Sequence, residues 1–169
     1  MTKKLTLVAA LIGCVWALVA VNAQEKEREP VWALKFQDFA VTDVFKGKPA
    51  QPILTKNNRW YRTRIRDGAA KGPNFAGHYT IAIWGCGSGC ASLVVVDAAS
   101  RKVYASPFGY IGMPMPTGEN GHEYHGPVFQ LKSRLLIADG CLEDEKCGTF
   151  YYEWTANKFK FVRSDPQPK

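Results

Sequence analysis

Two short loops, each with a cysteine at both ends, constrain this fold more than any other feature of the sequence. The first runs from Cys86 to Cys90 and the second from Cys141 to Cys147. The residues on either side of each loop are rich in β-branched and aromatic side chains, which strands prefer. This spacing favours one disulfide within each loop, where it would staple the end of a β-hairpin.

Other uses of these four cysteines are less consistent with the spacing. Disulfides between the two loops are an alternative if the loops meet in space, because four cysteines allow three pairings. Zinc pairs usually have two to four residues between their cysteines, and the second loop has five. Neither loop is the Cys-x-x-Cys of a catalytic redox pair. We therefore expect two disulfides and no cofactor.

The first 23 residues have the pattern of a signal peptide. Lys3 and Lys4 precede an apolar run over residues 5–21, and Ala23 ends a small-residue cleavage site before a polar stretch. We expect a periplasmic or secreted protein that begins at Gln24. Lipidation of Cys14 is an alternative, since residues 11–14 resemble a lipobox, but the apolar run continues past Cys14. An uncleaved anchor is a further alternative, although the run is short for a membrane span.

The remaining chain has the size of one domain. We expect a charged, flexible lead-in over residues 24–30, a single disulfide-stapled β-rich domain over 31–165, and a tail over 166–169. Loss of the signal removes two lysines and no acid, so the formal net charge falls from +7 to +5. A basic exported protein favours anionic partners, such as cell-wall polymers, lipopolysaccharide or acidic proteins, and no nucleic acid is expected.

One helix is predicted, over residues 55–70. Tyr61, Ile65 and Ala69 recur every four residues and would share an apolar face, with Thr55 as the N-cap and the Gly-Pro pair at 72–73 as the stop. The helix carries the only dense group of arginines, at positions 59, 62, 64 and 66. These form either an ordinary solvated face or an anion-binding stripe.

Strands dominate after the helix. They are expected at residues 79–84, 92–96, 102–105, 128–131, 134–138, 149–154 and 159–162. For residues 31–45 we expect a strand or an irregular packed segment. A weak repeat, strand–cysteine loop–strand–turn–strand, recurs over 81–104 and 135–161. The predicted fold class is α+β: a predominantly antiparallel sheet of two meander units, packed face to face or extending one sheet, with one N-terminal helix packed on it.

The long Gly/Pro-rich loop at 107–126 is the main candidate for binding. Irregular loops on compact domains often carry function, and aromatic and methionine side chains offer large contact areas. The alternative is that these side chains fold back over the core. The candidate residues are Phe108, Tyr110, Met113, Met115 and Tyr124.

The glycines of the first cysteine loop suggest a second, weaker binding feature. Gly85, Gly87 and Gly89 surround Ser88 and indicate a tight loop of unusual dihedral angles that could cradle an anion with its amides. The loop lacks the lysine and the strand-to-helix context of a P-loop, and its glycines do not have the spacing of a nucleophile elbow.

The three histidines are an alternative site. His122, Glu123 and His125 lie together in the long loop, and His78 precedes a strand. Together they would suit a transition metal or general acid–base chemistry. Short His-x-x-His matches are common, so ordinary polar and packing roles are the competing interpretation.

Several segments carry a resemblance. Residues 73–79 (PNFAGHY), 84–90 (WGCGSGC), 134–137 and 148–154 resemble a set of small exported bacterial proteins of unknown function. The resemblance covers most of the mature chain and implies an envelope protein, without an activity or site to transfer. In size, charge and disulfide style the chain also resembles periplasmic lysozyme inhibitors.

These observations favour a non-enzymatic envelope module that binds an anionic glycan or a protein partner, with no catalytic residue assigned. The alternatives are a metal-binding protein or metal-dependent hydrolase built on the histidines, and an inhibitor of a cell-wall hydrolase.

Overall fold

The computed structural model describes residues 34–87, 89–112, 126–141 and 147–166. The chain divides into two units, 1–34 and 35–169, and every described helix and strand belongs to the second. The predicted signal peptide, lead-in and Cys14 lie outside the described residues. Among those described, no helix is long and apolar enough to cross a membrane.

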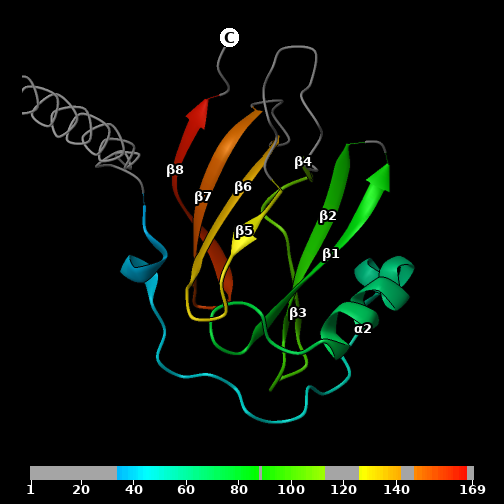
Figure 1. Ribbon diagram of the computed structural model, residues 1–169. Coiled ribbons are helices and arrows are strands. Elements are labelled where there is room, and N and C mark those ends of the chain that lie inside the picture. The colour runs from blue at the N-terminus through cyan, green and yellow to red at the C-terminus, as the bar shows by residue number, and fades with distance from the viewer. Residues whose placement is uncertain (1–33, 88, 113–125, 142–146, 167–169) are drawn as a thin grey trace, which may run out of the picture. The chain divides into compact units, whose positions relative to one another are not determined.

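Eight strands in the described part of the chain form one antiparallel sheet (Figure 1). They are β1 (Tyr79–Gly87), β2 (Cys90–Asp97), β3 (Val103–Ala105), β4 (Tyr110–Gly112), β5 (Val128–Phe129), β6 (Leu135–Cys141), β7 (Cys147–Thr155) and β8 (Lys158–Pro166). Their order is β1-β2-β4-β6-β7-β8, with β3 paired to β2 and β5 paired to β6. The prediction of a predominantly antiparallel sheet is confirmed.

The strand β4 joins the two halves of the sheet. Its Ile111 pairs with Ala91 of β2 on one side and with Gly140 of β6 on the other. A Cβ at position 140 would lie only 2.9 Å from the carbonyl oxygen of Tyr110, so glycine permits this close approach. The meanders β1-β2-β3 and β6-β7-β8 therefore extend a single sheet.

The sheet curls around an aromatic core. Tyr79 of β1 and Trp154 of β7 have ring centroids 5.1 Å apart, although several strands separate them in the sheet order. Phe75 is fully buried and contacts the rings of Phe129, Trp154 and Phe159 edge-on or at a tilt. Aromatic burial on this scale supplies much of the hydrophobic stabilisation of a small domain.

The predicted helix is present, but in the middle of the chain. It begins as a 3-10 helix, η3 (Lys56–Tyr61), and continues as α2 (Arg62–Ala70) before every strand. The expectation of an N-terminal helix is therefore not met, because the irregular segment before residue 56 also belongs to the sheet-bearing unit. Ile65 and Ala69 are buried as predicted and pack in a second small core with Trp84 and Val96.

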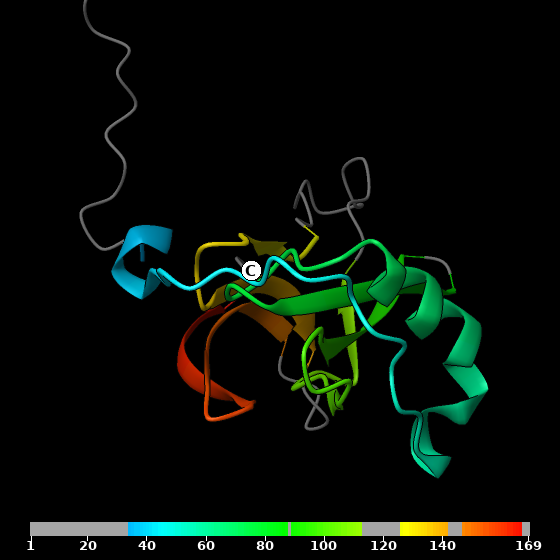
Figure 2. The same cartoon turned by 90° about the horizontal axis from the view of Figure 1, so that it is seen from below.

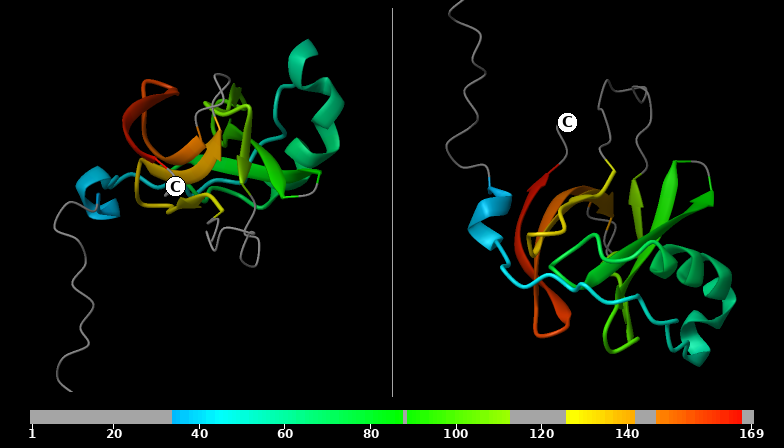
Figure 3. Two further views of the ribbon diagram at one scale, coloured as in Figure 1. Left: turned by 90° about the horizontal axis from the view of Figure 1, so that it is seen from above. Right: turned by 60° about the horizontal axis from the view of Figure 1, so that its bottom comes forward.

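Residues 40–55, which we call the strap, cross the ends of several strands (Figures 2 and 3). A short 3-10 helix, η2 (Phe36–Phe39), precedes it, so residues 31–45 include no long strand in their described part. The amide of Phe45 donates to the carbonyl of Gly77, and the amide of Ile53 donates to that of Arg101. These backbone hydrogen bonds tie the strap to the β-turns and bring the helix to the outer face of β1.

Candidate functional site: a groove at the broken edge of β2

The edge of β2 is interrupted where its neighbour changes from β3 to β4. Val94 pairs with Ala105, and Ala91 pairs with Ile111. Between these pairs β2 contributes only residues 92–93, whereas the other side contributes 106–110. Pro107, which cannot donate a ladder hydrogen bond, lies in the longer segment. The extra residues bow out of the sheet and open a gap beside β2.

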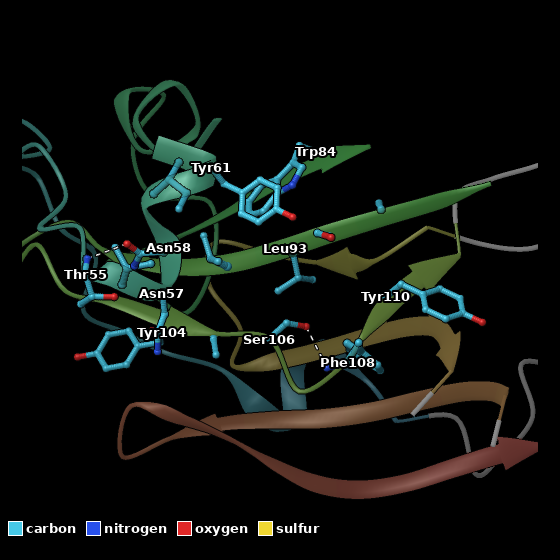
Figure 4. Close-up of a pocket in the computed structure, with 17 residues that line it drawn as sticks. Thr55, Asn57, Asn58, Tyr61, Trp84, Leu93, Tyr104, Ser106, Phe108 and Tyr110 are labelled. Carbon is cyan, nitrogen blue, oxygen red and sulfur yellow. Dashed lines mark hydrogen bonds between the residues drawn. The ribbon is translucent and has the colours of Figure 1, made fainter. Parts of the chain in front are cut away.

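The gap lies beside a groove that has a volume of about 470 Å³ (Figure 4). One wall comes from the helix and β1, through Asn57, Tyr61 and Trp84, and the opposite wall from the segment that ends at Tyr110. Leu93 lies between the walls (Figure 4). The volume is within the usual range for small-molecule sites, about 300–1,000 Å³.

Aromatic rings contribute to the apolar lining of the groove. Tyr61 is 50% exposed and lies over the buried Trp84, with ring centroids 5.1 Å apart. Tyr110 is 46% exposed, and Figure 4 shows it at the end of the groove away from Tyr104. Phe108 is only 7% exposed and packs on Tyr152, so its ring belongs mainly to the core. Tyr61 and Tyr110 are therefore the most exposed rings of the lining, since Tyr104 is only partly exposed.

Polar groups line the same groove. Asn57, Asn58, Ser92 and Ser106 line the groove with amide and hydroxyl groups. Asn58 is partly committed, because its Oδ1 accepts the amide of the helix N-cap Thr55 at 2.7 Å. Main-chain groups contribute as well: in an antiparallel strand successive residues direct their N–H and C=O to opposite sides, so either residue 92 or residue 93 directs its pair toward the gap. The groove thus combines stacking surfaces with donors and acceptors.

The indole nitrogen of Trp84, which lines the groove, has an unusual environment. Its side chain is buried, and its indole Nε1 has no hydrogen-bond partner among the described residues. The ring of the half-exposed Tyr61 packs against the same indole. A buried donor without a partner is uncommon in folded proteins, and this one belongs to a residue that lines the groove.

The first cysteine pair is bonded close to the groove. Cys86 and Cys90 form a disulfide with Cα atoms 5.4 Å apart at the end of the β1–β2 hairpin. Cys90 also pairs with Gly112 of β4, so the staple holds the strand end beside the groove. Gly87 and Gly89 have positive φ angles of 146° and 67°, as the glycine pattern predicts, whereas Gly85 does not have a positive φ. Ser88 lies outside the described residues.

The second cysteine loop is described only at its ends. Cys141 and Cys147 are directly paired across β6 and β7, and Cys147 is disulfide-bonded. Residues 142–146 and the side chain of Cys141 lie outside the described part of the chain. The disulfide predicted within this loop stays a prediction.

The predicted binding residues are only partly described. The structure places Phe108 and Tyr110 in the lining of the groove, one buried and one exposed. Met113, Met115 and Tyr124 lie outside the described residues. The helix wall, with Asn57 and Tyr61, was not predicted as part of a site. Pro107 beside a short apolar strand was the available signal that the sheet edge breaks here.

The histidine alternative is described only at His78. His122, Glu123 and His125 lie outside the described residues, and no group of three metal-ligating side chains occurs among those described. His78 Nδ1 lies 3.3 Å from Oδ1 of the buried Asp97. This contact links His78 to the β2–β3 turn.

The pKa of Asp97 reflects its place in that turn. Burial raises the pKa, but hydrogen bonds outweigh burial and hold it below its usual value. Ser100 donates through its hydroxyl and its amide, and the Ala99 amide and His78 also contribute. The carboxylate therefore stabilises the turn in its charged form.

Comparison of the chain with protein-family models, curated proteins and solved structures finds no match. The proposed function therefore rests on the groove and on the charge beside it.

Proposed function

We propose that this chain is an exported, non-enzymatic binding module that holds an anionic glycan in the groove beside β2. The observation that carries the proposal is the combination of accessible Tyr61 and Tyr110 rings with amide, hydroxyl and main-chain groups in one concave site. Sugar rings present apolar C–H faces that stack on aromatic rings, and hydroxyl edges that exchange hydrogen bonds with amides and hydroxyls.

The shape of the site favours a glycan over a protein partner. A stable protein interface takes about 800 Å² from each partner. The groove is instead a concave volume of about 470 Å³, which suits one or a few sugar rings. Side chains of this kind bind and orient a ligand.

The charge beside the groove supports an anionic ligand. Residues 56–71 include six basic residues and one acid, a net charge of +5, and the same helix contributes Asn57 and Tyr61 to the groove wall. Such a field raises the local concentration of anions and accelerates their association. Export, which the N-terminal pattern predicts, would place the groove among the acidic polymers of an envelope.

Affinity electrophoresis tests this proposal with defined probes. We expect the mature protein to be retarded in gels that contain hyaluronan, an anionic glycan, more than in gels that contain neutral dextran. Tyr110→Ala should weaken the retardation about tenfold, the effect of roughly 1.4 kcal/mol in affinity. Phe161→Ala is the matched control, because Phe161 is a similarly exposed aromatic residue on β8 outside the groove. Equal retardation of both variants, or no retardation of the parent, would contradict the proposal.

A further inference from the structure

The helix that walls the groove has an outer face with a different character. Residues 56–71 hold a net charge of +5, whereas the whole unit 35–169, with 18 basic and 12 acidic residues, has +6. Nearly all of the net charge of the folded unit therefore lies in one helix. A field concentrated in this way marks a surface for a polyanion or an anionic layer.

The basic side chains on this face are available for an external partner. Arg59, Arg62 and Arg66 are exposed and follow one another at i, i+3 and i+7, which brings them to one side of the helix. None of them has an ion-pair partner within the described part of the chain. Their guanidinium groups can therefore pair with phosphate oxygens in the bidentate geometry that arginine favours.

Trp60 lies within this basic stretch and is 90% exposed. It does not line the groove, although its neighbour Tyr61 does. A soluble polyanion would need the arginines but would gain little from an exposed indole. Tryptophan together with arginine is instead the combination that favours the headgroup region of a bilayer, where the indole is amphipathic and the charges meet phosphates.

We propose that the outer face of residues 56–71 docks on a bilayer that contains anionic phospholipid. Trp60 enters the headgroup region, and Arg59, Arg62 and Arg66 pair with lipid phosphates. The groove opens along another side of the same helix, toward β2. Docking would thus hold the glycan site close to the membrane surface without covering Tyr110. Both proposals use the charge of this helix, but the groove lining includes neither Trp60 nor the three arginines, so vesicle binding is tested separately from glycan binding.

Sedimentation with vesicles tests the docking surface. The mature protein would be mixed with vesicles of phosphatidylcholine alone and with vesicles that also contain 30% phosphatidylglycerol, at about 50 mM salt. We expect binding to the anionic vesicles only, with a shift of tryptophan fluorescence to shorter wavelength. Raising the salt to about 0.5 M should release most of the protein, because surface charges are then screened within a few ångströms.

Charge variants separate this helix from the rest of the surface. Arg62→Gln with Arg66→Gln should lower the partition coefficient about thirtyfold, because each basic residue near an anionic membrane contributes about 1 kcal/mol. Lys158→Gln with Lys160→Gln removes the same charge from exposed positions on β8 and should change it less than threefold. Equal effects of the two pairs would overturn the proposal, since they would show only net charge.

Trp60→Ala distinguishes a membrane from a soluble polyanion. We expect this variant to lose at least fivefold in vesicle binding and all of its fluorescence shift, while its retardation by hyaluronan is unchanged. Circular dichroism would confirm that the variant is folded, as expected for an exposed position. Unchanged vesicle binding by Trp60→Ala would assign the basic face to soluble polyanions and refute the docking model.

Discussion

Gly68→Ala should destabilise the protein, although the same change stabilises most helices. Gly68 lies on the side of α2 that faces β1, and a Cβ at this position would overlap the Cβ of Ala82 and lie 3.2 Å from its Cα. An alanine in an ordinary helix position is about 1 kcal/mol more favourable than glycine. Overpacking of a tight contact costs about 1–3 kcal/mol. We expect a net loss of up to about 2 kcal/mol in the free energy of unfolding.

The partner substitution provides the control for this contact. Ala82→Gly alone should cost about 1 kcal/mol, as glycine does inside a regular element. The double variant, which moves the methyl group from the strand to the helix, should be more stable than Gly68→Ala alone. The coupling energy should thus favour the double variant by about 1 kcal/mol or more, a value typical of residues in contact.

Urea denaturation followed by tryptophan fluorescence would measure these changes as shifts of the midpoint at constant slope. Tyr61, at the end of the preceding 3-10 turn, packs on Trp84. Gly68→Ala should therefore also widen the groove and weaken the retardation by glycan. A Gly68→Ala variant about 1 kcal/mol more stable than the parent would refute the reasoning, because it would show that the helix does not rest on β1 at this point.

Three further outcomes follow from the described residues. Stability should fall as the pH drops below about 4, because the Asp97 pKa is held low in the fold and its contribution is lost on protonation; Asp97→Asn should flatten this part of an acid-unfolding curve. Burial raises the pKa values of Tyr79 and Tyr152 in the folded protein. Above about pH 10 the unfolded chain therefore ionises first, and the free energy of unfolding should decline. Absorbance at 295 nm should then rise together with unfolding. Removal of the Cys86–Cys90 disulfide by double serine substitution should cost about 2 kcal/mol, the loop-entropy value for so short a loop, and a thermal melt without any shift would contradict this role.

Local patterns in the sequence predicted most of the regular structure. The alternating β-branched and aromatic runs predicted the hairpins β1–β2 and β7–β8. The glycines predicted the turn between Cys86 and Cys90, where Gly87 and Gly89 have positive φ angles. These features depend on neighbouring residues and on a single period, which one sequence can reveal. The four-residue spacing likewise placed Ile65 and Ala69 in the core, but Tyr61 is exposed because it ends the preceding 3-10 turn.

Contacts between distant segments were not predictable in the same way. β4 is three residues long and lies in a stretch rich in glycine and proline, so its local pattern indicated a loop. Its strand character depends on pairing with both β2 and β6, which are distant in sequence. The groove depends on the same long-range pairing, because the unequal segments between Ala91 and Val94 appear only once the register is known.

The most direct test of the central claim is an amide NMR titration of residues 24–169 with a hyaluronan tetrasaccharide. Binding in the groove predicts shifts for the amides of Ser92, Leu93 and Tyr110 and for the indole N–H of Trp84, with little change along β8. Shifts confined to other surfaces, or none at millimolar tetrasaccharide, would contradict the account of a glycan-binding groove at the broken edge of β2.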